Sequence, residues 1–306
     1  MAGLAAALLP GGTGVAWWLA VAAVLGIAAS LLSPLADAVT LALAASRRLD
    51  YGRTRAWGSV AYMLATAAAG WLLTTAGSGV VPVLLLAGYG AAAAGACWMP
   101  DVGGRTVRTD AAGPFRDAAF RLALLGTALI QGSHAAYYSF APLHWRAAGL
   151  SDTTIGLLIA EGIVAEVALF LWGRGLVERA GPARLTAIAA AICVVRWTAL
   201  AFVTDWRALA GLQVLHAGTF ALQHLSTMMV LRRLPPERAG TAQTVLAALG
   251  FSAATGVLVW VTGRIYGPWG GLAFLPMAVV GGLALLTVAP LARSLRRTVP
   301  ARWRTA

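Results

Sequence analysis

The sequence predicts an all-α, polytopic membrane protein with about nine transmembrane helices. Two observations lead to this fold class. First, 59% of the 306 residues are hydrophobic and only 11% are charged. Soluble domains carry about 25% charged residues, so this composition excludes a soluble enzyme and a disordered chain. Second, the apolar runs are continuous over roughly 20 residues, as in membrane-spanning helices, whereas a β-barrel would show alternating segments of about 10 residues.

Long apolar runs follow one another along the chain, and each is long enough to cross the hydrocarbon core as a helix. The predicted spans are 15–45, 57–76, 80–99, 118–145, 154–173, 184–203, 207–231, 240–265 and 269–291. A shorter apolar stretch, residues 2–9, precedes Pro10. It is too short to span, and it lacks the basic start of a signal peptide.

Arginine placement predicts the orientation, because cytoplasmic loops collect positive charge. The arginines gather in alternate loops, beginning with Arg47 and Arg48 after the first run, and the intervening loops hold at most one each. We therefore expect a multi-pass protein of the cell (inner or plasma) membrane with a cytoplasmic C-terminus. The net charge of +12 then reflects topology, and no nucleic-acid partner is expected.

The longest polar segment, residues 100–117, contains proline, glycine and charges, and it predicts a central cytoplasmic linker. Residues 1–99 hold three of the apolar runs, and residues 118–306 hold six runs and a basic tail. Six-helix halves are typical of one large class of secondary transporters. We therefore expect a partial N-terminal bundle in 1–99 and a six-helix bundle in 118–306.

Short phrases at several places on the predicted helices and loops together resemble a known family. They are Asp50-Tyr51-Gly52-Arg53-Thr54-Arg55, Gln131-Gly132-Ser133-His134, Val164-Ala165-Glu166, Val194-Val195-Arg196-Trp197 and His216-Ala217-Gly218-Thr219-Phe220. The resemblance is to the major facilitator superfamily, in the branch of the phenylpropionate permease and, more distantly, the lactose permease. It implies that residues 1–99 hold the end of helix 3 and helices 4–6, that 118–306 hold helices 7–12, and that the first two to three helices are absent.

Ionisable side chains inside the predicted spans are the first site candidates. A charge at the bilayer centre costs about 2.5–3.5 kcal/mol on insertion scales, so such groups usually face a bundle interior or a wet cavity. Glu166 and Arg196 lie on neighbouring antiparallel runs, where a pair at mid-depth is plausible. A substrate anion that competes for Arg196 would release Glu166 for protonation. The resemblance implies proton coupling by Glu166, Arg196 and His216, and a structural ion pair is the alternative.

Substrate contacts are expected from polar and aromatic side chains near the midplane. The candidates are Gln131, His134, Tyr137, Tyr138, Arg196 and His224. The same groups could instead bond neighbouring helices. Glu161 lies about 140° around the helix from Glu166 and is either a second titratable group or a contact to another helix.

Charged loop residues form the last group of candidates. Asp50, Arg53, Arg55, Glu178 and Arg179 are interpreted as gating-loop residues, with ordinary solvated charges as the alternative. The segment 176–181 resembles the gating motif of the superfamily. It departs from that motif at Arg174, where glycine is usual, and at Pro182, where a basic residue is common.

Together these patterns favour a proton-coupled symporter of a small organic solute that works by alternating access. The resemblance implies an aromatic acid such as phenylpropionate. A nucleoside or sugar transporter of the same superfamily and a truncated, non-transporting relic are the alternatives. The sequence has no motif of a metalloprotease, a lipase or a phosphate loop, so we expect no enzyme, metal or cofactor. The expected partners are the solute, protons and membrane lipids.

Overall fold

The computed structural model describes residues 51–99, 110 and 112–297, with isolated positions between 14 and 43. These residues form helices and no strand, which confirms the all-α fold class. The chain divides into two compact units, Met1–Thr106 and Val107–Ala306, and the division falls inside the predicted linker 100–117. Each unit is described by itself below.

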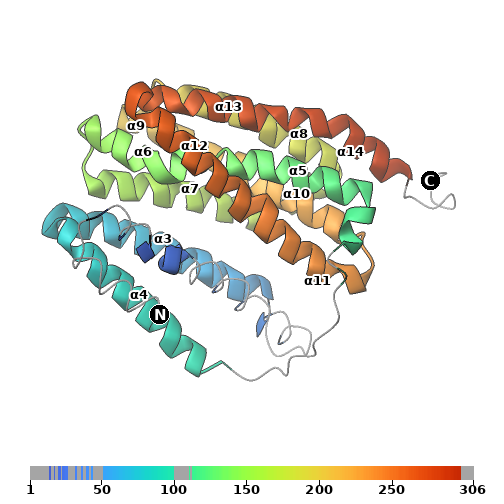
Figure 1. The fold of residues 1–306 in the computed structure, drawn as a ribbon, viewed down its shortest axis with the longest axis horizontal. Helices are drawn as coiled ribbons and strands as arrows, with labels where there is room; N and C mark the ends of the chain where they lie inside the picture. Colours follow the sequence, from blue (N-terminus) through green and yellow to red (C-terminus); the bar gives the residue numbers. More distant parts are fainter. Residues whose placement is uncertain are drawn as a thin grey trace. The chain divides into compact units, whose positions relative to one another are not determined.

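The first unit contains a helical hairpin, in which α3 (Tyr51–Ala76) and α4 (Val81–Cys97) run antiparallel (Figure 1). The two helices are joined by the short 3-10 helix η2 (Ser78–Val80). Gly77 makes the turn with a φ of 72°, in the left-handed region that glycine tolerates best. The hydroxyl of Tyr89 on α4 donates to the carbonyl of Leu25 at 3.0 Å, so Leu25 lies against this helix.

The second unit follows the predicted runs, but several of them are broken into shorter helices. Run 118–145 forms α5 (Ala118–Gly132) and α6 (Ala135–Ala147). Run 207–231 forms α9 (Trp206–His216), the π-helical segment η4 (Ala217–Ala221) and α10 (Leu222–Leu231). The last run forms α13 (Phe274–Leu283) and α14 (Leu285–Arg297).

The remaining elements of the second unit complete the bundle. Two are long single helices, α7 (Asp152–Trp172) and α8 (Arg174–Leu200), the second of which is kinked at Gly181. A further run begins with α11 and continues through a π-helical segment. This run consists of α11 (Pro236–Val245), the π-helical segment η5 (Leu246–Ala253) and α12 (Ala254–Trp269). Two short 3-10 helices, η3 (Gly113–Arg116) and η6 (Gly270–Ala273), lie elsewhere in the unit.

Five segments of the described residues are long and apolar enough to cross a membrane by length and composition. They are Trp57–Ala76, Ser78–Cys97, Asp152–Trp172, Val177–Leu200 and Gly240–Arg297. The last covers 58 residues and includes two of the predicted runs. Broken pairs such as α5 and α6 fall short of this length individually, so the number of spans stays a prediction.

Polar residues between the apolar runs fix where several helices begin. Asp117 accepts a hydrogen bond from the backbone of Phe120 at the start of α5. Asp205 accepts from the backbone of Arg207 and Ala208 at the start of α9. Such caps satisfy N–H groups that have no partner within the helix. Because each cap marks where a helix begins, it also sets how far along that helix the buried polar side chains lie.

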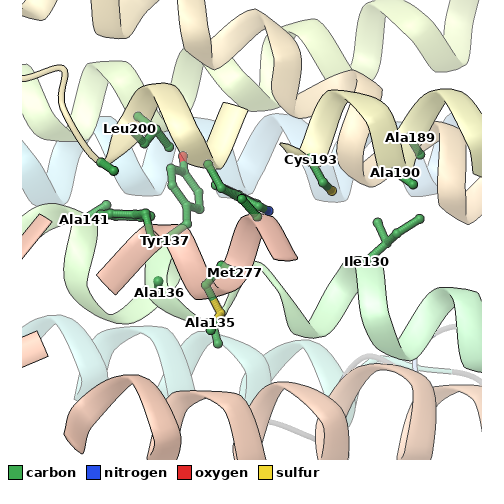
Figure 2. Close-up of a cluster of buried hydrophobic side chains, with 14 of the residues drawn as sticks. Ile130, Ala135, Ala136, Tyr137, Ala141, Ala189, Ala190, Cys193, Leu200 and Met277 are labelled. Carbon is green, nitrogen blue, oxygen red and sulfur yellow. The ribbon is translucent and has the colours of Figure 1, made fainter. Parts of the chain in front are cut away.

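Small side chains bring the helices of the second unit close together. Figure 2 shows Ala135 and Ala136 of α6, Ala189 and Cys193 of α8, and Met277 of α13 in one buried cluster. A Cβ atom added to Gly281 of α13 would lie 2.7 Å from the Cβ of Cys193, so α8 and α13 touch at this glycine. Close backbone approach of this kind is how membrane helices gain packing energy. The central polar site lies beside this core.

Candidate functional site

The guanidinium of Arg196 lies fully buried in the second unit and is the centre of the candidate site. Its Nη2 atom donates to Oε1 of Gln213 at 2.8 Å, and its Nη1 atom donates to Oγ1 of Thr219 at 3.2 Å. The same Nη1 atom lies 3.1 Å from Nδ1 of His216. These three partners come from α9 and η4, so Arg196 ties α8 to that continuous helix.

The arginine also fixes the protonation pattern of His216. Arginine offers only donors, so Nδ1 of His216 must accept and the ring proton must lie on Nε2. That Nε2 atom is 3.6 Å from Oε2 of Glu166 on α7. The predicted Glu166–Arg196 pair is therefore linked through the imidazole of His216.

Aromatic rings and neutral polar groups enclose the arginine. The Cζ atom of Arg196 lies 4.6 Å from the ring centroid of Tyr137 and 4.7 Å from that of Trp197. Cation–π contacts of this kind contribute about 0.5–2 kcal/mol each. The Tyr137 hydroxyl donates to the same Gln213 oxygen at 3.2 Å, which orients the amide.

Two buried N–H donors of this site have no hydrogen-bond partner within the described residues. They are Nε of Arg196 and Nε2 of Gln213. An unmet buried donor costs about 1–3 kcal/mol. The site therefore holds donor capacity that a carboxylate or another acceptor on a bound solute can use.

His134 is held on the other side of Thr219. Its Nδ1 atom lies 2.9 Å from the carbonyl of Ile130, and because a carbonyl only accepts, Nδ1 carries the proton. In the neutral ring, Nε2 is then an acceptor 3.0 Å from the Thr219 hydroxyl, whose single proton also faces the carbonyl of His216 at 3.1 Å. Thr219 thus connects Arg196 on α8 with His134 at the start of α6.

A column of rings continues from the arginine along α9, η4 and α10. His216 stacks on Phe220 with centroids 5.5 Å apart, and Phe220 is nearly parallel to His224 at 6.4 Å. Gln131 donates to the carbonyl of Phe220 at 3.3 Å. Tyr138 stacks on His134 at 5.6 Å and remains 45% exposed. The structure thus gathers the candidates for substrate contact around one helix.

Three members of this site were not among the site residues predicted from the sequence: Gln213, Thr219 and Trp197. Gln213, His216 and Thr219 recur at three-residue spacing, which puts polar groups on one side of an apolar helix. That stripe is the pattern that would have found two of them. The π-helical turn of η4 had no marker in the sequence, and π-turns occur frequently at functional sites.

The remaining candidates lie away from this centre. Glu161 is half-buried on α7, and within the described residues it has no hydrogen-bond or ion-pair partner. Glu178 and Arg179 are exposed near the start of α8. Asp50 lies outside the described residues, as do the side chains of Arg53 and Arg55, which belong to the first turns of α3. In the described part of the chain, no group of three or more acidic, histidine or cysteine side chains is placed to hold a metal ion.

A bundle of apolar helices around a buried, hydrogen-bonded arginine is the arrangement expected of a membrane transporter. Residues 2–275 match the sequence profile of the MFS_1 like family, and the chain belongs to this family of the major facilitator superfamily. This assignment confirms the resemblance seen in the sequence phrases, and it defines a multi-pass membrane transporter.

Two curated relatives cover most of the chain. A protein of Escherichia coli (strain K12) named "Probable 3-phenylpropionic acid transporter" is 31% identical over 280 residues, which are 88% of this chain and 73% of the relative. A protein of Geobacillus stearothermophilus named "Maltose permease" is 30% identical over 280 residues, 85% of this chain and 68% of the relative. Both names describe transport of a small molecule, and they differ in its chemical class.

Proposed function

We propose that the protein is a proton-coupled symporter of a small organic anion, with Arg196 as the anion-binding group. The observation that carries this proposal is the series of contacts from Glu166 through His216 to Arg196. In this series a carboxylate and a buried guanidinium lie on either side of one imidazole. The relative named for 3-phenylpropionic acid supports an aromatic acid as the solute.

Charge balance supplies the coupling in this proposal. A carboxylate at Glu166, a neutral His216 and a cationic Arg196 together carry no net charge. A solute anion that enters the site adds a negative charge in a medium of low dielectric, where unbalanced charge is costly. Uptake of one proton restores neutrality, so the anion and the proton are favoured together.

The same imidazole gives the proton a defined place. When the anion takes hydrogen bonds from Arg196, the Nδ1 atom of His216 loses its donor and becomes a proton acceptor. Nε2 still faces Glu166, so the proton can be shared between the imidazole and the carboxylate. Through His216, the protonation of the site therefore depends on which acceptor Arg196 bonds.

The ring column and the unmet donors together support an aromatic acid, because a sugar lacks the aromatic ring and a nucleoside lacks the carboxylate. Phe220 and His224 are half-buried and Tyr138 is 45% exposed, so part of the surface of these rings is open to a solute. Offset and edge-to-face ring pairs contribute about 0.5–1.5 kcal/mol beyond the burial of their area. A solute with a ring and a carboxylate uses both the rings and the unmet donors.

In this proposal the protein works by alternating access. Glu178 and Arg179, at the start of α8, form one gating segment in this proposal, and Asp50, Arg53 and Arg55 of the first unit form another. The C-terminus lies in the cytoplasm, as the arginine pattern predicts. A reporter fused after Ala306 should therefore read cytoplasmic.

The test compares uphill uptake with exchange in proteoliposomes that contain the full chain. Glu166→Gln should abolish phenylpropionate uptake driven by an imposed pH gradient, while exchange of labelled for unlabelled solute continues. Glu161→Gln, a carboxyl change on the same helix, is the matched control and should retain both activities. Uphill uptake that is unchanged in Glu166→Gln would contradict the coupling role. Binding of phenylpropionate to the purified chain, measured by tryptophan fluorescence, separates a failure to bind from a failure to move the solute.

A further inference from the structure

The arginines at the two ends of the second unit differ in how they are partnered. At the end where α6 and α12 finish, the described arginines each have an intramolecular partner. Arg146 donates from Nε to Asp152 at 2.8 Å. Arg207 lies 5.4 Å above the ring of Trp206, and Arg264 lies 4.6 Å above that of Trp260.

The opposite end, where α10 and α14 finish, carries exposed arginines without acidic partners. Within the described residues, no carboxylate lies within 4.0 Å of any of them. The described acids at this end are otherwise placed: Asp110 pairs with Arg116 at 3.4 Å, and Asp117 caps α5. Glu178 is exposed on α8. We call this surface the basic end, and it consists of Arg121, Arg184, Arg232, Arg233, Arg293, Arg296 and Arg297.

The basic end is one surface, because its helices pack on a shared apolar cluster. That cluster joins α5, α10 and α14 through Ala119, Val230, Leu291 and Leu295, all of them buried. Arg233 donates from Nη1 to the carbonyl of Leu295 at 3.3 Å, which ties the end of α10 to α14. On α14, positions 293, 296 and 297 share one face at helical spacing, so their guanidinium groups project together.

We propose that the basic end binds the anionic headgroups of phospholipids in the adjacent leaflet. Arg121 and Arg233 each donate to a backbone carbonyl, but carbonyls do not neutralise their charge. Cations without acidic partners on one surface repel one another, and a phosphate diester removes that repulsion. Arginine suits this ligand because its planar group can donate two parallel hydrogen bonds to a phosphate. Clusters of four to eight basic residues next to a membrane helix are typical of anionic-lipid binding.

The position of the basic end favours a lipid over a soluble anion. Leu291 and Leu295 alternate with Arg293, Arg296 and Arg297 on the last turns of a helix whose preceding residues belong to an apolar span. The guanidinium groups therefore lie where the hydrocarbon ends and the headgroups begin. Lipid binding there is independent of the solute in the central site, so it stands or falls separately from the proposed transport.

The experiment counts lipid molecules bound to the purified full chain by native mass spectrometry in detergent. Phosphatidylglycerol and phosphatidylcholine with the same acyl chains are titrated in parallel. The variant Arg233→Gln with Arg296→Gln removes two charges from the basic end. The variant Arg207→Gln with Arg264→Gln removes two charges from the opposite end and is the matched control.

We expect the wild-type chain to bind phosphatidylglycerol more tightly than phosphatidylcholine. Each arginine near an anionic surface contributes about fivefold in affinity, so the variant of the basic end should lose roughly 25-fold. The matched control should stay within about twofold of wild type, because Arg207 and Arg264 lie outside the basic end and over tryptophan rings. If the double variant fails to fold, as judged by circular dichroism, Arg293→Gln alone should show a loss of about fivefold.

Equal binding of the two lipids, or equal losses in the two double variants, would overturn the proposal. Inorganic phosphate provides the remaining arm of the experiment. Displacement of phosphatidylglycerol by an equal concentration of inorganic phosphate would identify a soluble anion as the ligand and would also overturn it. Retention of the lipid against phosphate supports a headgroup site at the membrane surface.

Discussion

Arg196 donates a hydrogen bond from Nη1 to Nδ1 of His216, with 3.1 Å between the two nitrogen atoms. The bond occupies the one ring nitrogen of His216 that could take a second proton. Protonation of His216 therefore requires that Arg196 turn to another acceptor. This relationship makes the position of a buried arginine and the proton count of a buried histidine mutually dependent.

The first prediction separates the acceptor role of His216 from its ability to take a proton. His216→Asn keeps a side-chain oxygen that can accept from Arg196, but the amide does not titrate. We expect solute exchange to persist and uphill uptake to fall at least tenfold. Without a titratable imidazole, the charge of the bound anion stays unbalanced in a site of low dielectric, which costs several kcal/mol. His144→Asn, at the far end of α6, is the matched control. Uphill uptake at the wild-type rate in His216→Asn would show that His216 takes no part in coupling.

The second prediction concerns the hydroxyl of Thr219. Thr219→Val keeps the shape of the side chain but leaves Arg196 and His134 each without one partner. The expected loss is about 1–3 kcal/mol in the free energy of unfolding, measured by circular dichroism during denaturation in detergent. Thr262→Val is the control, because that buried hydroxyl bonds the carbonyl of Leu258 in its own helix at 2.7 Å. Equal losses in the two variants would mean that the Thr219 network adds no stability of its own.

The third prediction tests the close contact of α8 and α13. In Gly281→Ala the new methyl group would meet the Cβ of Cys193 at 2.7 Å, and this atom cannot rotate away. Overpacking of this kind typically costs 1–3 kcal/mol, about 2 kcal/mol here. The thermal unfolding temperature in detergent should fall accordingly. Gly256→Ala on α12 has open space within 4 Å and should leave the unfolding temperature unchanged or raise it. A neutral Gly281→Ala would contradict the packing.

The fourth prediction uses the two cysteines of the chain as reporters on burial. Cys97 at the end of α4 is exposed, whereas Cys193 is fully buried beside Ser133. A maleimide should therefore add once to the folded chain, at Cys97, and twice after denaturation, as mass spectrometry would show. Cys97→Ser should abolish labelling of the folded chain. Rapid labelling of Cys193 in Cys97→Ser would mean that the core of the second unit is open to reagent.

Much of the fold follows from the sequence because only a few backbone structures are stable in a bilayer. In hydrocarbon every backbone N–H and C=O needs an internal partner, so long apolar runs must become helices. Asp117 and Asp205 stand between such runs and cap the helices that follow. The breaks within the runs were missed, as at Ser133 between α5 and α6, because the apolar pattern continues across them.

The sequence alone determined the family and the helical membrane class. It also marked the ionisable side chains within the apolar runs, because a charge there is conspicuous. Tertiary structure decided how those residues meet. Gln213 and Thr219 became partners of Arg196 only through the packing of α8 against α9 and the π-turn of η4. It also decided which arginines have partners, as Arg146 does and Arg296 does not within the described residues. The composition of a helix determines which of its side chains must avoid lipid. The rotation and register of the packed helices determine which partner each of those side chains contacts.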